Sequence, residues 1–372
     1  MNISEIGTRC TGCFACASKC ALNLIKMEKN EYGFYHAIIT ESSRCVDCGR
    51  CLQVCPIKQH PKESVPIAAF YGSSHDRDIL QYSSSGGLFP SIAQNIISKN
   101  GIVYGAVMDY KKKSVMHLSS PNATLQEMSG SKYIQSYICN SFQNARRDLE
   151  QGKTVLFSGA KCQIYGLKQS IPDSLQENLY TMDFVCHGVA SPLLFDKYIE
   201  FFERIHHTKI TNYNWRSKKR GWNRATTLVS CENGKKYYIA GGFSFMHSLF
   251  SDNVSVSPAC IKCPFSSCSF SDITIADYWD YKGRVEDADL ILQGISLGMI
   301  NSEKGDRLCR NTESFDLIGN LEVPNDTDYC FVNREQRDDS AQKRFYRQFN
   351  KYGLFAAGMY YCRHVIKGMF NR

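Results

Sequence analysis

Two short runs of cysteines near the start of the chain constrain its fold more than any other feature. Both runs have the spacing C-x2-C-x2-C-x3-C. They comprise Cys10, Cys13, Cys16 and Cys20, and then Cys45, Cys48, Cys51 and Cys55. Three thiols at intervals of three residues can wrap around one metal cluster, whereas the fourth points away from it. Residues 1–60 are therefore expected to fold around metal, as a small separate module.

This spacing resembles that of bacterial ferredoxins with two 4Fe-4S clusters, in which the last cysteine of each run binds the cluster of the other run. It predicts one cluster on Cys10, Cys13, Cys16 and Cys55, and a second on Cys45, Cys48, Cys51 and Cys20. Residues 24–40 are expected to form two short strands with a turn at Gly33. A pair of zinc sites is the alternative, but zinc usually takes its ligands from two C-x2-C pairs.

Length and cysteine content point to a metalloprotein of a reducing compartment. A chain of 372 residues can bury a core without disulfides, so its 18 cysteines need another explanation. We expect a cytoplasmic protein, because neither a signal peptide nor an apolar run long enough to span a membrane is visible. The net charge of +8 is compatible with an acidic redox partner or an anionic cofactor.

The remainder of the chain is expected to be a mixed α/β body over residues 69–333, after a proline-containing linker at 57–68. The fold class is thus α+β and α/β combined: a small ferredoxin-like module followed by a mixed α/β body. Ser85, Gly86 and Gly87 precede a helix predicted from Leu88. Free N–H groups at such a turn suit a pyrophosphate, although a simply capped helix is an equal alternative.

Further cysteines follow the predicted strands of the body. Cys162 and Cys186 each stand where a strand ends, and ligands gather at that edge of an open α/β sheet. Cys260 and Cys263 form a C-x2-C pair that cannot complete a metal site alone. Cys162 and Cys186 could supply the missing ligands, with Cys268 as a competitor. The other cysteines are expected to be buried free thiols: Cys139, Cys231, Cys309, Cys330 and Cys362.

Several short motifs of the body are similar to those of the coenzyme F-420 hydrogenase/dehydrogenase beta-subunit family. The resemblance covers most of residues 69–305. Its motifs are Ser85-Gly86-Gly87, residues 130–133, Cys162-Gln163-Ile164, Cys186-His187-Gly188, Cys260-x-x-Cys263, Asp272-Ile273-Thr274, Asp277-Tyr278-Trp279 and residues 294–297.

The resemblance implies FAD and a third 4Fe-4S cluster in addition to the two predicted above. The implied ligands of the third cluster are Cys162, Cys186, Cys260 and Cys263, and the implied flavin contacts are Ser85, Gly86, Gly87, Lys161 and Gln163. His187 is a candidate catalytic proton donor, although a histidine that bonds a backbone carbonyl is as good an interpretation.

Two departures from the family pattern bear on the substrate. Lys161 replaces a proline, and Asp280 replaces a glycine, so a deazaflavin substrate is in doubt. Members with a fused ferredoxin also resemble proteins associated with surface-polysaccharide synthesis. The resemblance then suggests another two-electron acceptor, such as a nucleotide-linked sugar intermediate.

The predicted function is therefore that of an iron–sulfur flavoprotein oxidoreductase, which relays electrons between ferredoxin-type clusters and a two-electron acceptor or donor. The alternative is a non-catalytic electron-transfer subunit of a partner enzyme. Expected partners are a redox protein and a small molecule, not nucleic acid. The basic helical tail at 334–372 could touch a membrane surface, but a helix packed on the body with a solvated basic face is the favoured interpretation.

Overall fold

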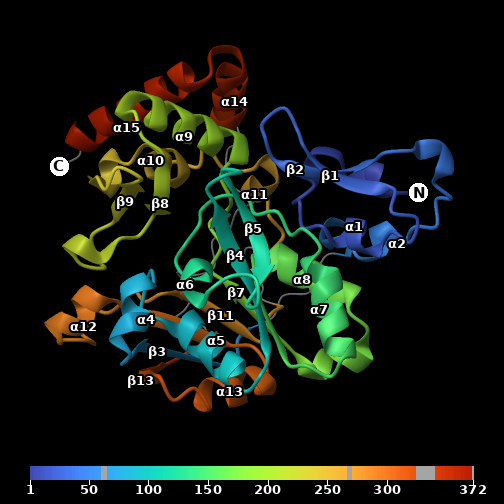
Figure 1. The fold of residues 1–372 in the computed structure, drawn as a ribbon, viewed down its shortest axis with the longest axis horizontal. Helices are drawn as coiled ribbons and strands as arrows, with labels where there is room; N and C mark the ends of the chain where they lie inside the picture. The colour runs from blue at the N-terminus through green and yellow to red at the C-terminus, as the bar shows by residue number, and fades with distance from the viewer. Residues whose placement is uncertain (60–64, 266–269, 324–339, 371–372) are drawn as a thin grey trace.

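The computed structural model describes residues 1–59, 65–265, 270–323 and 340–370, with side chains described as far as residue 363. The cysteine-rich head lies against one side of a central sheet, and a second lobe that includes the C-terminal helices lies beyond one end of that sheet (Figure 1). The expected fold class, a ferredoxin-like module followed by a mixed α/β body, is confirmed.

The head consists of short elements, because its loops must turn around the cysteines. Strands β1 and β2 pair antiparallel, with Ile25 opposite Ile39, as the sequence predicted. Gly33 has φ 81° in the turn between them, a conformation that glycine adopts without strain. The elements are η1 (Ile3–Arg9), α1 (Ala15–Lys19), β1 (Ile25–Lys29), β2 (Tyr35–Ile39), η2 (Ser42–Arg44), α2 (Arg50–Gln53) and α3 (Pro56–Gln59). Helix α3 occupies the start of the predicted linker, so that prediction was wrong for residues 57–59.

The central sheet has eight strands in the order β13-β3-β12-β11-β7-β6-β4-β5. Strands β4, β6, β7 and β11 run parallel, while β5, β12 and β13 pair antiparallel with their neighbours. The sheet is therefore mixed, with a parallel centre and antiparallel pairs toward its edges. The bounds are β3 (Ala68–Ser74), β4 (Ile102–Asp109), β5 (Ser114–Ser119), β6 (Val155–Ser158), β7 (Leu179–Phe184), β11 (Ile273–Asp277), β12 (Ser296–Ile300) and β13 (Phe315–Leu321).

Helices cover both faces of this sheet. Leu88, Ile92 and Ile96 of α5 are buried against one face, which confirms the helix predicted from Leu88. Its N-cap is Gly87 in the left-handed region, not a serine. The helices around the sheet are α4 (Arg77–Tyr82), α5 (Leu88–Ser98), α6 (Leu125–Met128), α7 (Ser141–Glu150), α8 (Lys161–Ser170), η3 (Asp173–Asn178), α12 (Ala288–Gln293) and α13 (Glu303–Arg310).

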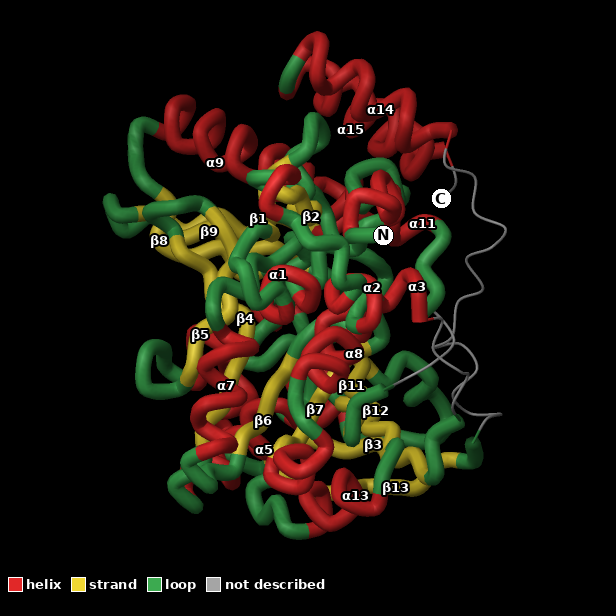
Figure 2. The backbone as a smooth tube through the Cα atoms, turned by 90° about the vertical axis from the view of Figure 1, so that its right-hand side faces the viewer, coloured by secondary structure: helices red, strands yellow, loops and turns green. Residues whose placement is uncertain are grey.

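Helices α7 and α8 lie between the sheet and the head (Figure 2). Phe142 and Leu149 of α7 and Ile164 of α8 share one continuous hydrophobic core with Ile3 and Phe14 of the head. Burial of this shared apolar surface fixes the head to the body, because each large side chain removed from water contributes about 1.5–3 kcal/mol. The head is thus an integral part of the molecule and not a tethered appendage.

The second lobe is built on a three-stranded antiparallel sheet, β10-β9-β8. Helix α9 begins at Pro192, a residue that suits the first turn because no N–H is needed there, and it continues to His206. The elements of this lobe are α9 (Pro192–His206), β8 (Ile210–Asn214), η4 (Lys218–Arg220), β9 (Thr226–Cys231), β10 (Lys236–Ala240), η5 (Gly241–Phe243), α10 (Phe245–Ser251), α11 (Pro258–Ile261), α14 (Ser340–Tyr352) and α15 (Leu354–Phe370).

The C-terminal helices pack on the body. Phe345, Tyr346 and Phe349 of α14 are buried. The Tyr346 hydroxyl donates a 2.6 Å hydrogen bond to the Ser255 carbonyl, and its ring contacts the Tyr32 ring at 4.9 Å. Helix α14 thus bridges the body and the head hairpin, which confirms the packed interpretation for this helix. No helix within the described residues is long and apolar enough to cross a membrane.

The cysteines expected to be buried free thiols differ in their exposure to solvent. Cys231 is buried, and Cys139 and Cys309 are half-buried. Cys362 is exposed, so the expectation was wrong there, because α15 turns this position to solvent. Cys330 lies outside the described residues.

One buried side chain, Gln135, joins the head to the body through three hydrogen bonds. Its Oε1 accepts from the Tyr35 N–H at 2.7 Å. Its Nε2 donates to the carbonyls of Thr11 and Tyr35, each at 3.3 Å. Gly12 has no side chain, and a Cβ there would lie 2.3 Å from Gln135 Nε2. The amide therefore holds the loop that carries Cys10 and Cys13.

Replacing Gln135 with leucine is expected to destabilise the protein by at least about 2 kcal/mol, because an unsatisfied buried backbone group costs about 1–3 kcal/mol. Urea unfolding and limited proteolysis of residues 1–60 measure the effect. Gln176→Leu is the matched control. The Gln176 amide donates to the Lys168 and Ile171 carbonyls at a half-exposed position within the body. Equal protease resistance of the head in both variants would contradict the role assigned to Gln135.

Candidate iron–sulfur and flavin sites

The four thiols predicted to hold the first cluster line one cavity. Cys10, Cys13, Cys16 and Cys55 face it together, and its other walls are mainly apolar, formed by Ile3, Phe14, Met27 and Ile57. Cys16 and Cys55 come from opposite cysteine runs, so the exchange of the last ligand between runs is present in the fold. An apolar shell around four thiols suits a cubane, because exclusion of water tunes its potential.

The protonation chemistry of this cavity favours a bound cluster. Burial, together with the smaller effect of the neighbouring Cys10 and Cys55 sulfurs, raises the pKa of Cys13 to about 12. Burial likewise raises the pKa of Cys16 well above its usual value. Metal ligation requires thiolates, and cluster iron supplies the positive charge that compensates for them. The residues therefore fit a 4Fe-4S cluster.

The second set of ligands lies closer to the surface. Cys51 is buried, Cys20 and Cys45 are half-buried and Cys48 is exposed. Burial raises the pKa of Cys51, and the Cys48 sulfur adds to this rise, so these two sulfurs are neighbours. That Cys20 and Cys45 complete the same site remains a prediction from the spacing.

A third group of thiols meets at the carboxyl edge of the sheet. Cys162 lies in the first turn of α8 after β6, and Cys186 follows β7. Cys260 lies in α11. A Cβ at Gly188 would lie 3.3 Å from the Cys260 Cβ, so this glycine lets the two cysteine segments pack together.

Electrostatic contacts join this third group. Burial raises the pKa of Cys162 well above its usual value, and Cys13, Cys263, Cys186 and Cys260 all raise it further. The structure thus brings together the four predicted ligands, while their role as ligands stays a prediction. The competing candidate, Cys268, lies outside the described residues.

Within the part of the chain that the structure describes, no three His, Cys, Asp or Glu side chains converge closely enough to hold a single ion. A zinc ion has its thiolates at about 2.3 Å, whereas a cubane spreads its ligands over a larger volume. Metal analysis of the purified protein distinguishes zinc from iron.

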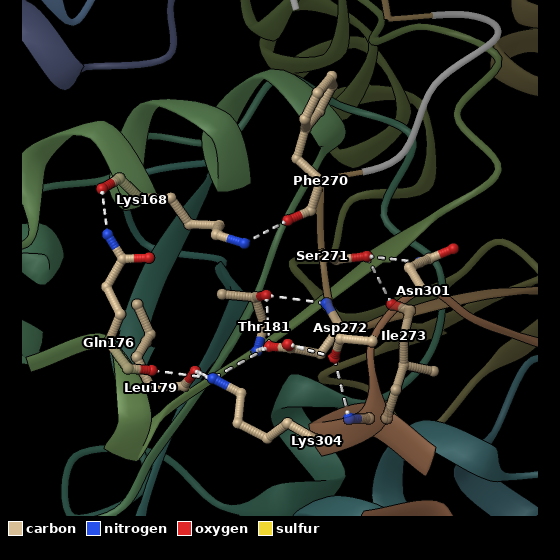
Figure 3. Close-up of polar contacts among 12 residues, drawn as sticks. Lys168, Gln176, Leu179, Thr181, Phe270, Ser271, Asp272, Ile273, Asn301 and Lys304 are labelled. Atoms are coloured by element: carbon tan, nitrogen blue, oxygen red, sulfur yellow. Dashed lines mark hydrogen bonds and ion pairs between the residues drawn. The ribbon is translucent and has the colours of Figure 1, made fainter. Parts of the chain in front are cut away.

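A polar network around Asp272 anchors the segment that returns from the third cysteine group to β11 (Figure 3). One Asp272 oxygen accepts 2.8 Å hydrogen bonds from the Thr181 N–H and hydroxyl, and the other accepts from Ser302 at 2.7 Å. Lys168 of α8 donates to the Phe270 carbonyl at 2.9 Å. Because α8 also carries Cys162, this network fixes two of the cysteine segments relative to each other.

The predicted flavin turn at residues 85–87 lies at the same edge of the sheet. A Cβ at Gly86 would lie 2.6 Å from both the Gly72 carbonyl oxygen and the Ser296 nitrogen, and Gly87 has φ 85°. The Ser85 hydroxyl donates to the Ile295 carbonyl at 2.6 Å. Backbone packing thus accounts for both glycines, and the turn alone does not require a cofactor.

Gln163 and Lys161 lie beside the third cysteine group instead. The Gln163 Oε1 accepts from the Ala160 N–H at 2.9 Å, and its Nε2 donates to Ser136 at 3.0 Å. Both side chains are buried. Residues 131–136 connect this region to the predicted turn, because the Ser131 N–H donates to the Ser84 hydroxyl at 2.7 Å.

A cluster of charged and aromatic side chains at this edge was missed as a site from the sequence. The Arg216 guanidinium pairs with Asp277 at 2.9 Å and lies 5.1 Å from the centre of the Trp279 ring. Trp222 stacks on Trp279 with ring centres 4.7 Å apart and donates its indole N–H to Asp277 at 2.8 Å. Trp279 is 46% exposed, so part of its ring faces solvent.

Arg216 itself has unused hydrogen-bonding capacity. The residue is 8% exposed, and its buried Nη2 atom has no hydrogen-bond partner within the described residues. Burial lowers the pKa of Arg216, but the Asp277 carboxylate outweighs this effect and the net shift is upward. A permanent buried cation with a spare donor fits the anionic part of a flavin nucleotide.

Two lysines lie close to the predicted turn. Lys218 donates to the Ser85 and Leu80 carbonyls at 2.6 and 2.9 Å. Lys132 donates to three carbonyls, of which the Ser129 oxygen is nearest at 2.8 Å. Burial lowers the pKa of each lysine to about 7. The sequence signal was present in the basic run at 216–220, but only the fold shows that it faces the turn.

His187 lies between the third cysteine group and this cluster. Its ring is 5.0 Å from the Phe250 ring, which is 4.8 Å from the Tyr133 ring. Tyr133 in turn interacts with Arg216. Aromatic contacts therefore connect the residue after Cys186 to the Arg216 region. A catalytic role for His187 stays a prediction.

Comparison with known proteins places two parts of the chain. Residues 152–319 match the C terminus of the coenzyme F420 hydrogenase/dehydrogenase beta subunit, and residues 9–58 match the 4Fe-4S dicluster domain. The chain thus joins an iron–sulfur dicluster domain to an F420 hydrogenase/dehydrogenase beta-subunit domain. The recognition of both from sequence is confirmed, although residues 69–151 of the predicted resemblance lie outside the matched range.

One solved structure is similar in outline. It is a chain of the F420-reducing [NiFe] hydrogenase complex from Methanosarcina barkeri, with 15% identity and a TM-score of 0.48. The similarity covers 77% of this chain and 94% of that chain. No curated protein matches the sequence.

Proposed function

We propose that the protein is an iron–sulfur flavoprotein oxidoreductase that relays electrons between the clusters of its head and an FAD-linked two-electron acceptor or donor. The dicluster match supports the two 4Fe-4S clusters of the head. The observation that carries the proposal is the meeting of Cys162, Cys186, Cys260 and Cys263 at the sheet edge, beside the head and next to the Arg216 region.

FAD is proposed to bind along the edge from the Ser85–Gly87 turn to Trp279. Arg216 and Lys218 would hold its anionic groups, the buried charge of Lys132 would lie near them, and the exposed part of Trp279 would contact the ring. When bound, the flavin supplies the exchange between two-electron and one-electron chemistry. The chain's own residues bind it, orient it and keep the adjacent thiols away from water. A role in surface-polysaccharide synthesis stays a prediction from the resemblance.

FAD affinity is expected to fall as the pH rises from 6 to 8.5. Because the pKa values of Lys132 and Lys218 are about 7, both side chains are cationic below that pH and become neutral above it. A charged donor stabilises a hydrogen-bonded anion by about 1 kcal/mol more than a neutral donor, which corresponds to about fivefold in affinity. Titration of flavin-depleted protein with FAD, followed by fluorescence quenching, measures the change.

Lys218→Met should flatten this pH profile. Lys219→Met is the matched control, because Lys219 is exposed and adjacent in sequence. A profile that remains equally steep in Lys218→Met and Lys219→Met would remove Lys218 from the proposed flavin site.

Anaerobic purification with quantification of iron, sulfide and flavin tests the proposed function. About twelve iron atoms per chain are expected from three cubanes, together with FAD released on denaturation. Reduction by a reduced ferredoxin should then bleach the absorbance of the oxidised flavin at about 450 nm. A preparation without flavin would rule out the proposal. Clusters that are reduced without turnover of any small molecule would favour an electron-transfer subunit of a partner enzyme.

A further inference from the structure

The two clusters of the head lie at different depths and have different neighbours in the body. The thiols of Cys10, Cys13, Cys16 and Cys55 line a cavity within the head, and the hydrophobic core around these cysteines continues into α8. We call the cluster proposed for this cavity the inner cluster, and the one proposed for Cys20, Cys45, Cys48 and Cys51 the outer cluster. The inner and outer clusters differ in how close their thiols lie to those of the third cluster.

The inner cluster is next to α8 because of one glycine. A Cβ at Gly166 would lie 2.9 Å from the Ala15 Cβ and 3.4 Å from the Cys13 sulfur. The Cys13 sulfur is therefore packed against the backbone of α8. Gly166 and Cys162 are four residues apart on this helix, so they share one face, one above the other. An inner-cluster ligand and a third-cluster ligand are thus separated by about one helical turn.

The outer cluster has the opposite surroundings. Cys48 is exposed, and Val46 in the same loop is 71% exposed. The described head residues place Cys51 next to Cys16 and Cys55, so the outer set adjoins the inner set. The three sites therefore form a row that starts at the surface of the head and ends at the edge of the sheet.

We propose that electrons pass in a fixed order, from the outer cluster to the inner cluster and then to the third cluster, with Gly166 as the residue that sets the last separation. This order rests on the proposed function. An external one-electron carrier protein loses one electron to the outer cluster in each passage, and the same electron moves on through the inner cluster to the third. Two passages supply the electron pair, and two protons from solvent balance its charge when the flavin is fully reduced.

Magnetic coupling between reduced clusters in the holoenzyme tests the order without any measurement of turnover. Dipolar splitting in an electron paramagnetic resonance spectrum falls with the cube of the distance, so neighbouring clusters split each other's signals strongly. We expect the third cluster to be split by the inner cluster. Cys48→Ser, which removes an outer-cluster ligand, should leave that splitting in place. Loss of the splitting in Cys48→Ser would overturn the order.

Substitution of Gly166 tests the contact itself. Gly166→Val should weaken the splitting while about twelve iron atoms per chain remain, because the larger side chain pushes the Cys13 segment away from α8. Gly358→Val is the matched control, because Gly358 is also helical and a Cβ there meets nothing within 4 Å. Splitting that is unchanged in Gly166→Val would overturn the role of this glycine.

A milder pair of variants guards against misfolding. Gly166→Ala should weaken the splitting, because its methyl group pushes against Ala15. The double variant Gly166→Ala with Ala15→Gly should restore it, since the opposing methyl group is gone. Failure of this rescue would count against the proposed contact.

The outcomes separate this proposal from the proposed function. Iron near eight atoms per chain, or absence of flavin, would overturn both. Twelve iron atoms with flavin, but with the third cluster split by the outer cluster or not at all, would overturn the order alone.

Discussion

Cys162→Ser is expected to lower the iron content from about twelve to about eight atoms per chain, with the signals of the head clusters retained. Cys162 is the thiol at which Cys186, Cys260 and Cys263 converge, and it begins the helix that also contacts the head. A serine hydroxyl is a poor substitute for a soft thiolate ligand of iron. Iron analysis and low-temperature electron paramagnetic resonance measure the result.

Loss of the third cluster in Cys162→Ser should also slow electron transfer to the flavin. Without the third cluster, reduced ferredoxin should still bleach the head clusters. The rate of flavin reduction by the same donor should fall at least about tenfold, which corresponds to a rise of about 1.4 kcal/mol in activation free energy. Cys231→Ser is the control, because Cys231 is buried in β9 of the second lobe. Twelve iron atoms in Cys162→Ser would contradict the assignment of this ligand.

Cys268→Ser distinguishes the remaining candidate ligand. If Cys162 is a ligand and Cys268 is not, Cys268→Ser should keep about twelve iron atoms per chain. This is the content of three cubanes with about four iron atoms each. The opposite pattern, with iron lost from Cys268→Ser and retained in Cys162→Ser, would assign the ligand to Cys268 and place the edge of the third cluster further from α8.

The parts of the fold that sequence could predict are those encoded locally. The hairpin at 24–40 follows from a polar turn with glycine, and α5 follows from apolar residues three and four apart. The edge that gathers Cys162 and Cys186 was also predictable, because strands β6 and β7 run parallel and their carboxyl ends meet.

The Arg216 region could not be found in this way. Arg216, Trp222 and Trp279 are separated by up to 63 positions, and no local spacing relates them. The basic run that contains Arg216 is ambiguous in sequence, because a solvated face produces the same letters. Burial and the carboxylate of Asp277 give this arginine its distinct environment, and both come from tertiary packing.

Gly86 belongs to a motif that was recognised from the sequence, but the structure gives a different reason for the glycine. The resemblance implied a cofactor contact. In the structure, the lack of a side chain is required by the backbones of β3 and β12, whose atoms would lie 2.6 Å from a Cβ. A short glycine motif cannot separate these two reasons, because both demand close approach of a backbone.

Arg216→Ala is expected to destabilise the protein by about 3–5 kcal/mol, because it leaves the Asp277 carboxylate without its cation in a mostly buried place. Arg216 pairs with this carboxylate at 2.9 Å, and the two side chains are 7% and 19% exposed. Arg310→Ala is the matched control: Arg310 pairs with Asp306 at 2.8 Å, but its side chain is 75% exposed. Exposed pairs contribute at most about 1 kcal/mol.

Two further variants separate stability from binding. Arg216→Ala combined with Asp277→Asn should recover part of the lost stability, because no unpaired charge remains. It should not recover flavin, because the buried Nη2 donor is still missing. Chemical unfolding and the FAD content of the purified protein measure both effects. A cost equal to that of Arg310→Ala would contradict the buried ion pair, and full FAD content in the double variant would show that Arg216 serves the fold alone.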